Sequence, residues 1–299
     1  MPGEVLTDTE VPKKKNPAIK VLVLLLKIAV TIFCFWYIST KIDFAKAAEA
    51  IKSANWIWLF FAILALALSK IISSYRLNIY FDNIRLILSQ KVNLKLYWLG
   101  MFYNLFLPGA ISGDAYKVIL LNRKYKTSYK KLSAAVLLDR FSGLLALGLI
   151  LSVFGVIVLD NKLYDIILIA GSILAVAATY FIIRYFFKDF IPGFWPTFFW
   201  GLLVQLLQVV CIYCIMLALR IPLTETEWIF IFLASAIITV IPVSLGGGLG
   251  TRELVFLEGA RYFGLDLHVA PVISILFYLA SAVISIGGVY FVYHDPLKE

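Results

Sequence analysis

The fold of this chain is decided by the stretch Ile241-Pro242-Val243-Ser244-Leu245-Gly246-Gly247-Gly248-Leu249-Gly250-Thr251-Arg252-Glu253. It lies between two strongly apolar segments, where an ordinary membrane helix would continue. Proline lacks a backbone donor, glycines favour irregular backbone, and the following arginine and glutamate are costly in hydrocarbon. Such backbone survives at membrane depth only when it is buried in protein or lines a wet cavity. The pattern predicts a broken helix that enters with residues 227–242 and returns with residues 249–263, so that its second half points its N-terminus into the protein.

The composition is that of a membrane protein. Of the 299 residues, 62% are apolar and 15% are charged, and apolar stretches of about 20 residues recur along the whole chain. We expect a single transmembrane domain over residues 18–295, a disordered cytoplasmic leader over 1–17 and a cytoplasmic tail over 296–299. The net charge of +9 comes from basic residues that flank the apolar segments, which indicates membrane topology and not nucleic-acid binding. The expected location is the cell (cytoplasmic) membrane, with both termini cytoplasmic.

Hydropathy and the positive-inside rule predict the order of the segments. A short amphipathic surface helix is expected over 41–54, and a turn at Pro192–Pro196 marks a midpoint linker. Six full spans are predicted, at residues 18–38, 55–75, 132–159, 163–187, 197–219 and 268–293.

A second break interrupts the apolar segment 94–121 at Pro108–Asp114. Each side is too short to cross about 30 Å of hydrocarbon as a helix, and basic residues flank both ends. We therefore expect a re-entrant hairpin. Residues 55–159 and 197–293 then share one order (span, broken hairpin, span) in opposite orientations. The predicted fold is an all-α integral membrane protein with six spans and two opposed re-entrant hairpins in an inverted repeat, a plan common among transporters.

Charges inside the apolar zone are the candidate functional groups: Asp114, Asp139, Arg140 and the pair Arg252-Glu253. Each should face the protein interior or water. Adjacent residues on a helix point in different directions, so Asp139 and Arg140 are not expected to pair with each other. We expect Asp139 to pair with Arg252, and Arg140 to pair with Asp114 or Glu253. Two hypotheses remain open, and both can hold at once. The charges are structural ion pairs, or the arginines bind an anionic lipid headgroup, for which their planar fork is suited.

Other chemistries are disfavoured. The glycine-rich stretch lacks the Lys-Ser/Thr ending of a phosphate-binding loop and follows no strand, so no nucleotide cofactor is expected. Cys34, Cys211 and Cys214 are interpreted as small packing residues, because Cys211 and Cys214 lack the α/β context of a redox motif. His268 and His294 have no partner at ligand spacing, so no metal site is predicted.

These residues resemble the transmembrane region of lysylphosphatidylglycerol synthases, also called the flippase-like domain. The resemblance covers nearly all of the chain after the leader. The first break resembles the family's N-x-x-x-P-G-x-x-G-G-D-x-x-R, with serine for one glycine and lysine for the arginine, in residues Asn104, Pro108, Gly109, Ser112, Gly113, Asp114 and Lys117. Asp139-Arg140 matches an acidic-Arg pair of the next helix, and Arg76 matches an arginine that closes the second span. The second break resembles P-x-S-x-G-G-x-G-x-R-E, with one residue added before the last glycine, in residues Pro242, Ser244, Gly246, Gly247, Gly250, Arg252 and Glu253.

The resemblance implies lipid translocation between leaflets, by a flippase or scramblase-like transporter of a phospholipid or polyprenyl-phosphate lipid. Relatives that make aminoacylated lipids carry a separate soluble synthase domain, so we expect a transporter and not an enzyme. The expected headgroup site comprises the residues of both motifs together with Asp139, Arg140 and Gly248. Expected partners are membrane lipids, a separate lipid-modifying enzyme and a second copy in a homodimer. The alternatives are a membrane transferase or accessory subunit in lipid-linked sugar assembly, and a non-transporting membrane scaffold.

Overall fold

The computed structural model describes residues 44–106, 112–240 and 250–298 without gaps, together with isolated positions between 22 and 40 and Gly248. Within these residues all regular secondary structure is helical. The elements are α2 (Phe44–Lys52), α3 (Trp56–Asn83), α4 (Gln90–Phe106), α5 (Ser112–Tyr125), α6 (Tyr129–Val158), α7 (Lys162–Phe186), η1 (Lys188–Gly193), α8 (Phe194–Ala218), α9 (Glu227–Val240), α10 (Thr251–Phe263), α11 (Ala270–Ile286), η2 (Gly287–Val289) and α12 (Tyr290–Tyr293).

Five helical segments in the described part of the chain are long and apolar enough to cross a membrane: Trp56–Asn83, Tyr129–Val158, Lys162–Phe186, Lys188–Ala218 and Ala270–Tyr293. Each coincides with one of the predicted spans, and α2 coincides with the predicted surface helix. The leader 1–17 and most of the predicted first span 18–38 lie outside the described residues.

Two boundaries differ from the prediction. The span predicted at 55–75 continues as α3 to Asn83, because the charged and polar residues near its end are buried in the protein instead of marking the membrane surface. The predicted turn at Pro192–Pro196 is helical: Pro192 lies in η1 and Pro196 in the first turn of α8. A first-turn proline is tolerated because its missing N–H would have no partner inside the helix.

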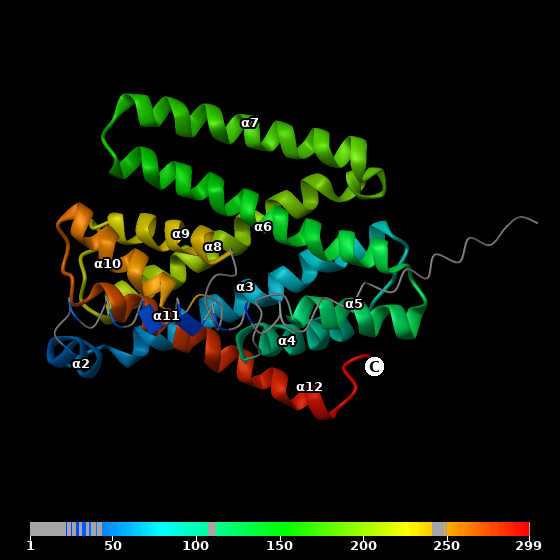
Figure 1. Ribbon diagram of the computed structural model, residues 1–299, viewed down its shortest axis with the longest axis horizontal. Coiled ribbons are helices and arrows are strands. Elements are labelled where there is room, and N and C mark those ends of the chain that lie inside the picture. Colours follow the sequence, from blue (N-terminus) through cyan, green and yellow to red (C-terminus); the bar gives the residue numbers. More distant parts are fainter. Residues whose placement is uncertain are drawn as a thin grey trace, which may run out of the picture.

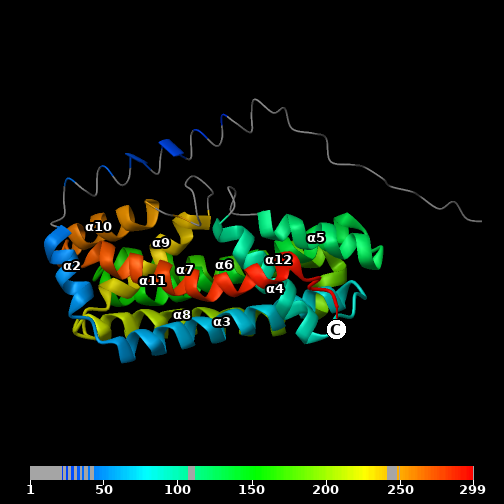
Figure 2. The same ribbon diagram turned by 90° about the horizontal axis from the view of Figure 1, so that it is seen from below.

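Both predicted breaks separate two helices. α4 and α5 form a first helix pair, and α9 and α10 form a second helix pair. Figures 1 and 2 show the pairs at opposite ends of the long axis of the molecule. Gly250 precedes α10 with φ of +84°, and Gly248 has φ of +107°, a conformation that glycine adopts readily. Apart from Gly248, the residues that join the two helices of each pair lie outside the described residues.

The helices after α2 pack in two sets of matching order. In the first set α3 contacts α4 and α6, and α5 contacts α4 and α6. In the second set α8 contacts α9 and α11, and α10 contacts α9 and α11. Between the sets, α3 packs along α8, α6 packs on α8 and α9, and α11 packs on α3 and α4. The last helix of each set therefore lies against the helix pair of the other set.

A polar zone separates two hydrophobic clusters. One cluster takes Leu66 from α3 and Leu147 from α6, and extends over α8 to α11. The other takes Leu77 from α3 and Leu138 from α6, and extends over α4 and α5. Between these points α3 and α6 carry most of their buried polar residues: Ser69, Ser73, Ser74, Arg76, Asp139 and Ser142. The apolar clusters hold the helices together on either side of these buried polar residues.

Candidate functional site

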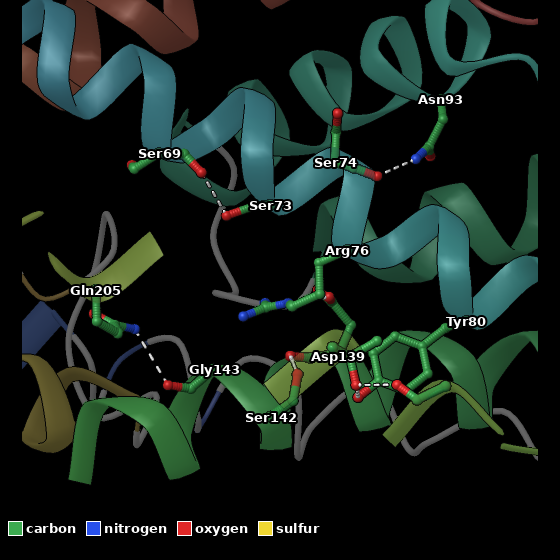
Figure 3. Close-up of polar contacts among 12 residues, drawn as sticks. Ser69, Ser73, Ser74, Arg76, Tyr80, Asn93, Asp139, Ser142, Gly143 and Gln205 are labelled. Atoms are coloured by element: carbon green, nitrogen blue, oxygen red, sulfur yellow. Dashed lines mark hydrogen bonds and ion pairs between the residues drawn. The ribbon is translucent and has the colours of Figure 1, made fainter. Parts of the chain in front are cut away.

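The centre of the polar zone is an ion pair between α3 and α6. Arg76 Nε lies 2.7 Å from Asp139 Oδ1, and the two side chains are 6% and 10% exposed. Figure 3 shows Arg76 extending from α3 toward the helix that carries Asp139. Taking both charges out of water is costly, so the pair stabilises the fold only when both partners are present. The expected pairing of Asp139 with Arg252 is wrong, because Arg76 occupies that carboxylate.

Small residues make room for the Arg76 guanidinium. A Cβ added at Gly143 would lie 3.3 Å from Nη1 and Nη2, and one at Gly201 would lie 3.4 Å from Nη1. Gln205 of α8 donates through Nε2 to the Gly143 carbonyl at 3.2 Å, as Figure 3 shows. Among the described residues, two buried polar atoms here have no hydrogen-bond partner, Arg76 Nη1 and Gln205 Oε1. Buried groups of this kind usually have a partner, so one donor and one acceptor beside the guanidinium remain able to form hydrogen bonds.

Asp114 lies in the first turn of α5 and holds two cations. Its Oδ1 is 3.0 Å from Lys117 Nζ, and its Oδ2 accepts from Arg140 Nε of α6. Asp114 and Lys117 are buried, whereas the Arg140 side chain is 37% exposed. Lys117 also lies over the ring of Tyr97 on α4, 4.5 Å from its centroid. The expected pairing of Arg140 with Asp114 is confirmed, and the expected alternative with Glu253 is not formed.

The first helix pair is closed by close backbone contact. The Gly113 N–H donates to Asn104 Oδ1 at 2.9 Å, and a Cβ at Gly113 would overlap the carbonyl of Gly100 on α4. A Cβ at Gly100 would in turn overlap the Lys117 side chain. Asn104 and Gly113, both expected at the headgroup site, therefore fix α4 against α5 and set the position of Asp114.

Glu253 of α10 is held by neutral donors. Its Oε2 accepts the Gly250 N–H at 2.7 Å, a bond from the helix's own N-cap backbone, and its Oε1 accepts the Ser274 hydroxyl of α11 at 2.8 Å. Glu253 thus connects the second helix pair to α11. Ser274 was missed by the sequence reasoning, because a serine inside an apolar span carries no signal of its partner.

We expect Ser274→Ala to lower the free energy of unfolding by about 1–3 kcal/mol, because it leaves a buried carboxylate oxygen without its donor. Thermal unfolding in detergent micelles would measure the loss. Ser69→Ala is the matched control, since Ser69 donates only to the Leu66 carbonyl one turn earlier in its own helix. Equal losses for the two variants would contradict a role for Ser274 in holding Glu253.

Arg252 precedes Glu253, and its environment is different. Its Cζ lies 4.9 Å from the ring centroid of Phe277 on α11, a distance at which a cation interacts with an aromatic face. Its Nε is buried and has no hydrogen-bond partner in the part of the chain that the structure describes. We call Arg76, Asp114, Lys117, Asp139, Arg140, Arg252 and Glu253 together the charged layer.

An open pocket reaches the charged layer from the side. It has a volume of about 360 Å³ between α5 and α6. Asp114 and Arg140 lie at one end, Tyr129 and Ser133 at the other, and the walls are apolar: Ala115, Val118, Ile119, Val136 and Leu137. A second cavity of similar volume lies between α6 and α7, but no charged side chain lines it. Of these two cavities, the α5–α6 pocket is the one that joins hydrocarbon-like walls to an ion pair.

Of the remaining expected site residues, the structure describes only some. Ser112 is the first residue of α5, and Gly248 and Gly250 precede α10. The others lie outside the described residues: Pro108, Gly109, Pro242, Ser244, Gly246 and Gly247. Among the described residues, no three His, Cys, Asp or Glu side chains gather closely enough to hold a metal ion.

A polar stripe on one face of α3 was also missed in the sequence. Ser69, Ser73, Arg76 and Tyr80 recur at spacings of four, three and four residues, which places them on one helical face, and all four are buried. A polar stripe of this kind inside an apolar span was a readable signal for a buried site.

Comparison with known proteins agrees with this picture. A family model described as the lysylphosphatidylglycerol synthase TM region matches residues 24–195, more than half of the chain. The matched region contains α3 to α7, and with them the Arg76–Asp139 pair and the α5–α6 pocket; it ends before the second helix pair. None of the curated proteins compared with the chain matches it.

Proposed function

The chain belongs to the lysylphosphatidylglycerol synthase TM region family, and from this premise we propose that it moves a phospholipid or polyprenyl-phosphate lipid between the leaflets of the cell membrane.

One observation carries the proposal, the α5–α6 pocket. Residues 129–140 of α6 extend about 16 Å along the helix at 1.5 Å per residue, which is close to the depth of one leaflet, about half of 30 Å. A hydrocarbon chain fits the apolar walls over this depth, and the Asp114–Arg140 pair receives the polar head. Arginine suits a phosphate because its planar fork donates two parallel hydrogen bonds.

The two contacts of Asp114 support a simple exchange. Lys117 binds Oδ1 and Arg140 binds Oδ2. A lipid phosphate can therefore replace Asp114 as the partner of Arg140 while Lys117 stays paired with the Asp114 carboxylate. No buried charge is left alone during this exchange, which keeps its cost low. The partial exposure of Arg140 gives the headgroup its access.

The proposed topology has six spans and two opposed re-entrant hairpins in an inverted repeat. The two helix pairs lie at opposite ends of the long axis (Figures 1 and 2), and each last helix packs on the helix pair of the other set. Both features fit a plan in which the hairpins enter from opposite membrane faces and the site lies near the midplane. Both termini are cytoplasmic in this plan.

Reconstitution into liposomes with fluorescent lipids tests the proposal. We expect leaflet exchange well above that of protein-free liposomes, and a rate lower by about tenfold to a hundredfold for Arg140→Ala, because one charge-assisted hydrogen bond contributes about 1.5–3 kcal/mol. Arg140→Lys should fall between, since lysine keeps the charge and loses the fork.

Arg184→Ala is the matched control, because Arg184 is exposed near the end of α7 and lies outside the charged layer. It should leave the exchange rate unchanged. Exchange no faster than in protein-free liposomes over a broad panel of lipids would reject transport. Product formed from a labelled lipid-linked sugar donor would favour the transferase alternative.

A further inference from the structure

The cavity between α6 and α7 continues the α5–α6 pocket along α6. The α6 residues that line the α5–α6 pocket run from Tyr129 to Arg140, and those that line the other cavity run from Phe141 to Ser152. We call this second cavity the α6–α7 groove; its other wall is formed by residues 167–179 of α7. Each of the two stretches of α6 extends about 16 Å at 1.5 Å per residue. Together the cavities therefore follow α6 over the whole hydrocarbon thickness of about 30 Å.

Arg140 lies where the two cavities meet. It lines the end of the α5–α6 pocket, and Leu144, one turn further along α6, lines the groove. Leu137 of the pocket and Phe141 of the groove are related in the same way. Residues four apart lie on the same face of a helix, so the groove begins on the part of the α6 surface where the pocket ends. A headgroup held by Arg140 is therefore within reach of both cavities.

The α6–α7 groove presents hydrocarbon. Among the described residues, no charged side chain lines it. The hydroxyls of Ser152 and Thr179 donate to carbonyls of their own helices at 2.9 and 2.7 Å, which leaves Ser172 Oγ as a buried donor without a partner in the described chain. Gly171 faces open space, since no described atom lies within 4 Å of a Cβ added there. Empty space beside a membrane helix forfeits dispersion contacts, and a hydrocarbon chain restores them.

Two cavities of similar volume, about 360 Å³ each, that meet at one arginine match a lipid with two chains. We propose that the α6–α7 groove binds one hydrocarbon chain of such a lipid while the α5–α6 pocket binds the other and Arg140 holds the headgroup. This inference rests on the proposed function and adds a second chain site to it. In the proposed topology the two chains then extend into opposite leaflets, which is a state halfway through translocation. A polyprenyl phosphate has a single chain and would use only one cavity.

Lipids that share a headgroup and differ in chain number test the proposal. The thermal unfolding temperature of the purified protein in neutral detergent is measured with phosphatidic acid, phosphatidylglycerol, phosphatidylethanolamine and phosphatidylcholine, each with two chains and in its one-chain lyso form. For at least one headgroup, the two-chain lipid should stabilise the protein with an apparent affinity about tenfold or more above that of the lyso form, because the second chain gains the contacts of the groove. Equal affinities for both forms, tighter binding of a polyprenyl phosphate, or no shift with any lipid would overturn the proposal.

Gly171→Leu fills the groove and leaves the α5–α6 pocket unchanged. Leucine is a better helix former than glycine, so the unfolding temperature without lipid should not fall. The apparent affinity for the two-chain lipid should drop about tenfold or more, to that of the lyso form, whose own affinity should stay the same. Ala170→Leu is the matched control, since Ala170 is exposed and does not line the groove; it should keep the preference for two chains. The same outcome in both variants would contradict the proposal.

Photoreactive chains locate the bound lipid. A two-chain lipid with a diazirine at the end of each chain is added to the protein in detergent, and its adducts are mapped by mass spectrometry. Adducts should form both on residues 115–137, beside the pocket, and on residues 144–152 and 167–179, beside the groove. Gly171→Leu should remove only the second group. Adducts beside the pocket alone, in the wild type, would show a single chain site and overturn the proposal.

Leaflet exchange, measured on the same preparations, separates this inference from the transport proposal. Two-chain binding that depends on Gly171, without exchange above that of protein-free liposomes, would reject transport and keep the groove. Exchange of a two-chain lipid that is unchanged in Gly171→Leu would reject the groove and keep transport.

Discussion

Asp139→Ala is expected to lower the free energy of unfolding by about 3–5 kcal/mol, because it leaves the buried Arg76 guanidinium without its carboxylate. Arg76 is 5% exposed and its Nη1 already has no partner among the described residues, so the charge left by the substitution would remain buried away from water. The loss can be followed by thermal or denaturant unfolding in detergent. The double variant Arg76→Met with Asp139→Leu should recover most of it, since an apolar pair of similar volume replaces an ion pair with little net cost.

A surface pair provides the comparison. Lys131 and Asp189 lie 3.1 Å apart with side chains 54% and 55% exposed, and pairs of this kind contribute about 0–1 kcal/mol. Asp189→Ala should therefore change the stability by no more than about 1 kcal/mol. If Asp139→Ala costs no more than Asp189→Ala, the buried pair is not what holds α3 against α6.

Gly113→Ala is expected to destabilise the protein by at least about 1–3 kcal/mol, the usual range for overpacking. Elsewhere in a helix the same change gains up to about 1 kcal/mol. At Gly113 the change should lower the free energy of unfolding instead, because the new methyl group would overlap the Gly100 carbonyl. Backbone cannot yield as a side chain can, so α4 and α5 must separate, and the Gly113–Asn104 hydrogen bond must weaken with them.

Gly148→Ala is the control, since nothing lies within 4 Å of the Cβ it would add. It should be neutral or stabilising in the same unfolding assay. Leaflet exchange should also fall in Gly113→Ala and not in Gly148→Ala, because a displaced α5 moves Asp114 away from Arg140. A neutral Gly113→Ala would mean that the two helices are not in backbone contact at this point.

Local chemistry explains what could be predicted from the sequence. Prolines and glycines interrupt apolar runs at Pro108 and Pro242, and both helix breaks follow from them. Five spans follow from hydropathy and length alone. The contact of Arg140 with Asp114 was predicted because a charge at membrane depth needs a partner, and few were available.

Tertiary geometry explains what could not be predicted. Asp139 has several basic residues within reach on hydropathy grounds, and only the rotation of α3 about its axis decides that Arg76 faces it. Glu253 could not be assigned to Ser274, because a hydroxyl in an apolar helix has no characteristic spacing. The end of the span predicted at 55–75 was wrong as well, since the sequence could not show that α3 continues to Asn83 with Arg76 buried in the protein.

α7 contributes little to holding the molecule together. Its main contacts are with α6 and η1, Ile183 is its buried residue, and Figure 1 shows it as the outermost helix, beside α6. In the proposed topology each unit begins and ends on the same face of the membrane, since two full spans and a hairpin return the chain to its starting side. The units can be opposed only if an odd number of crossings joins them. α7 supplies that single crossing, so its role is to keep the number of crossings between the units odd. Inserting one more crossing beside it would invert the orientation of the second unit in the membrane.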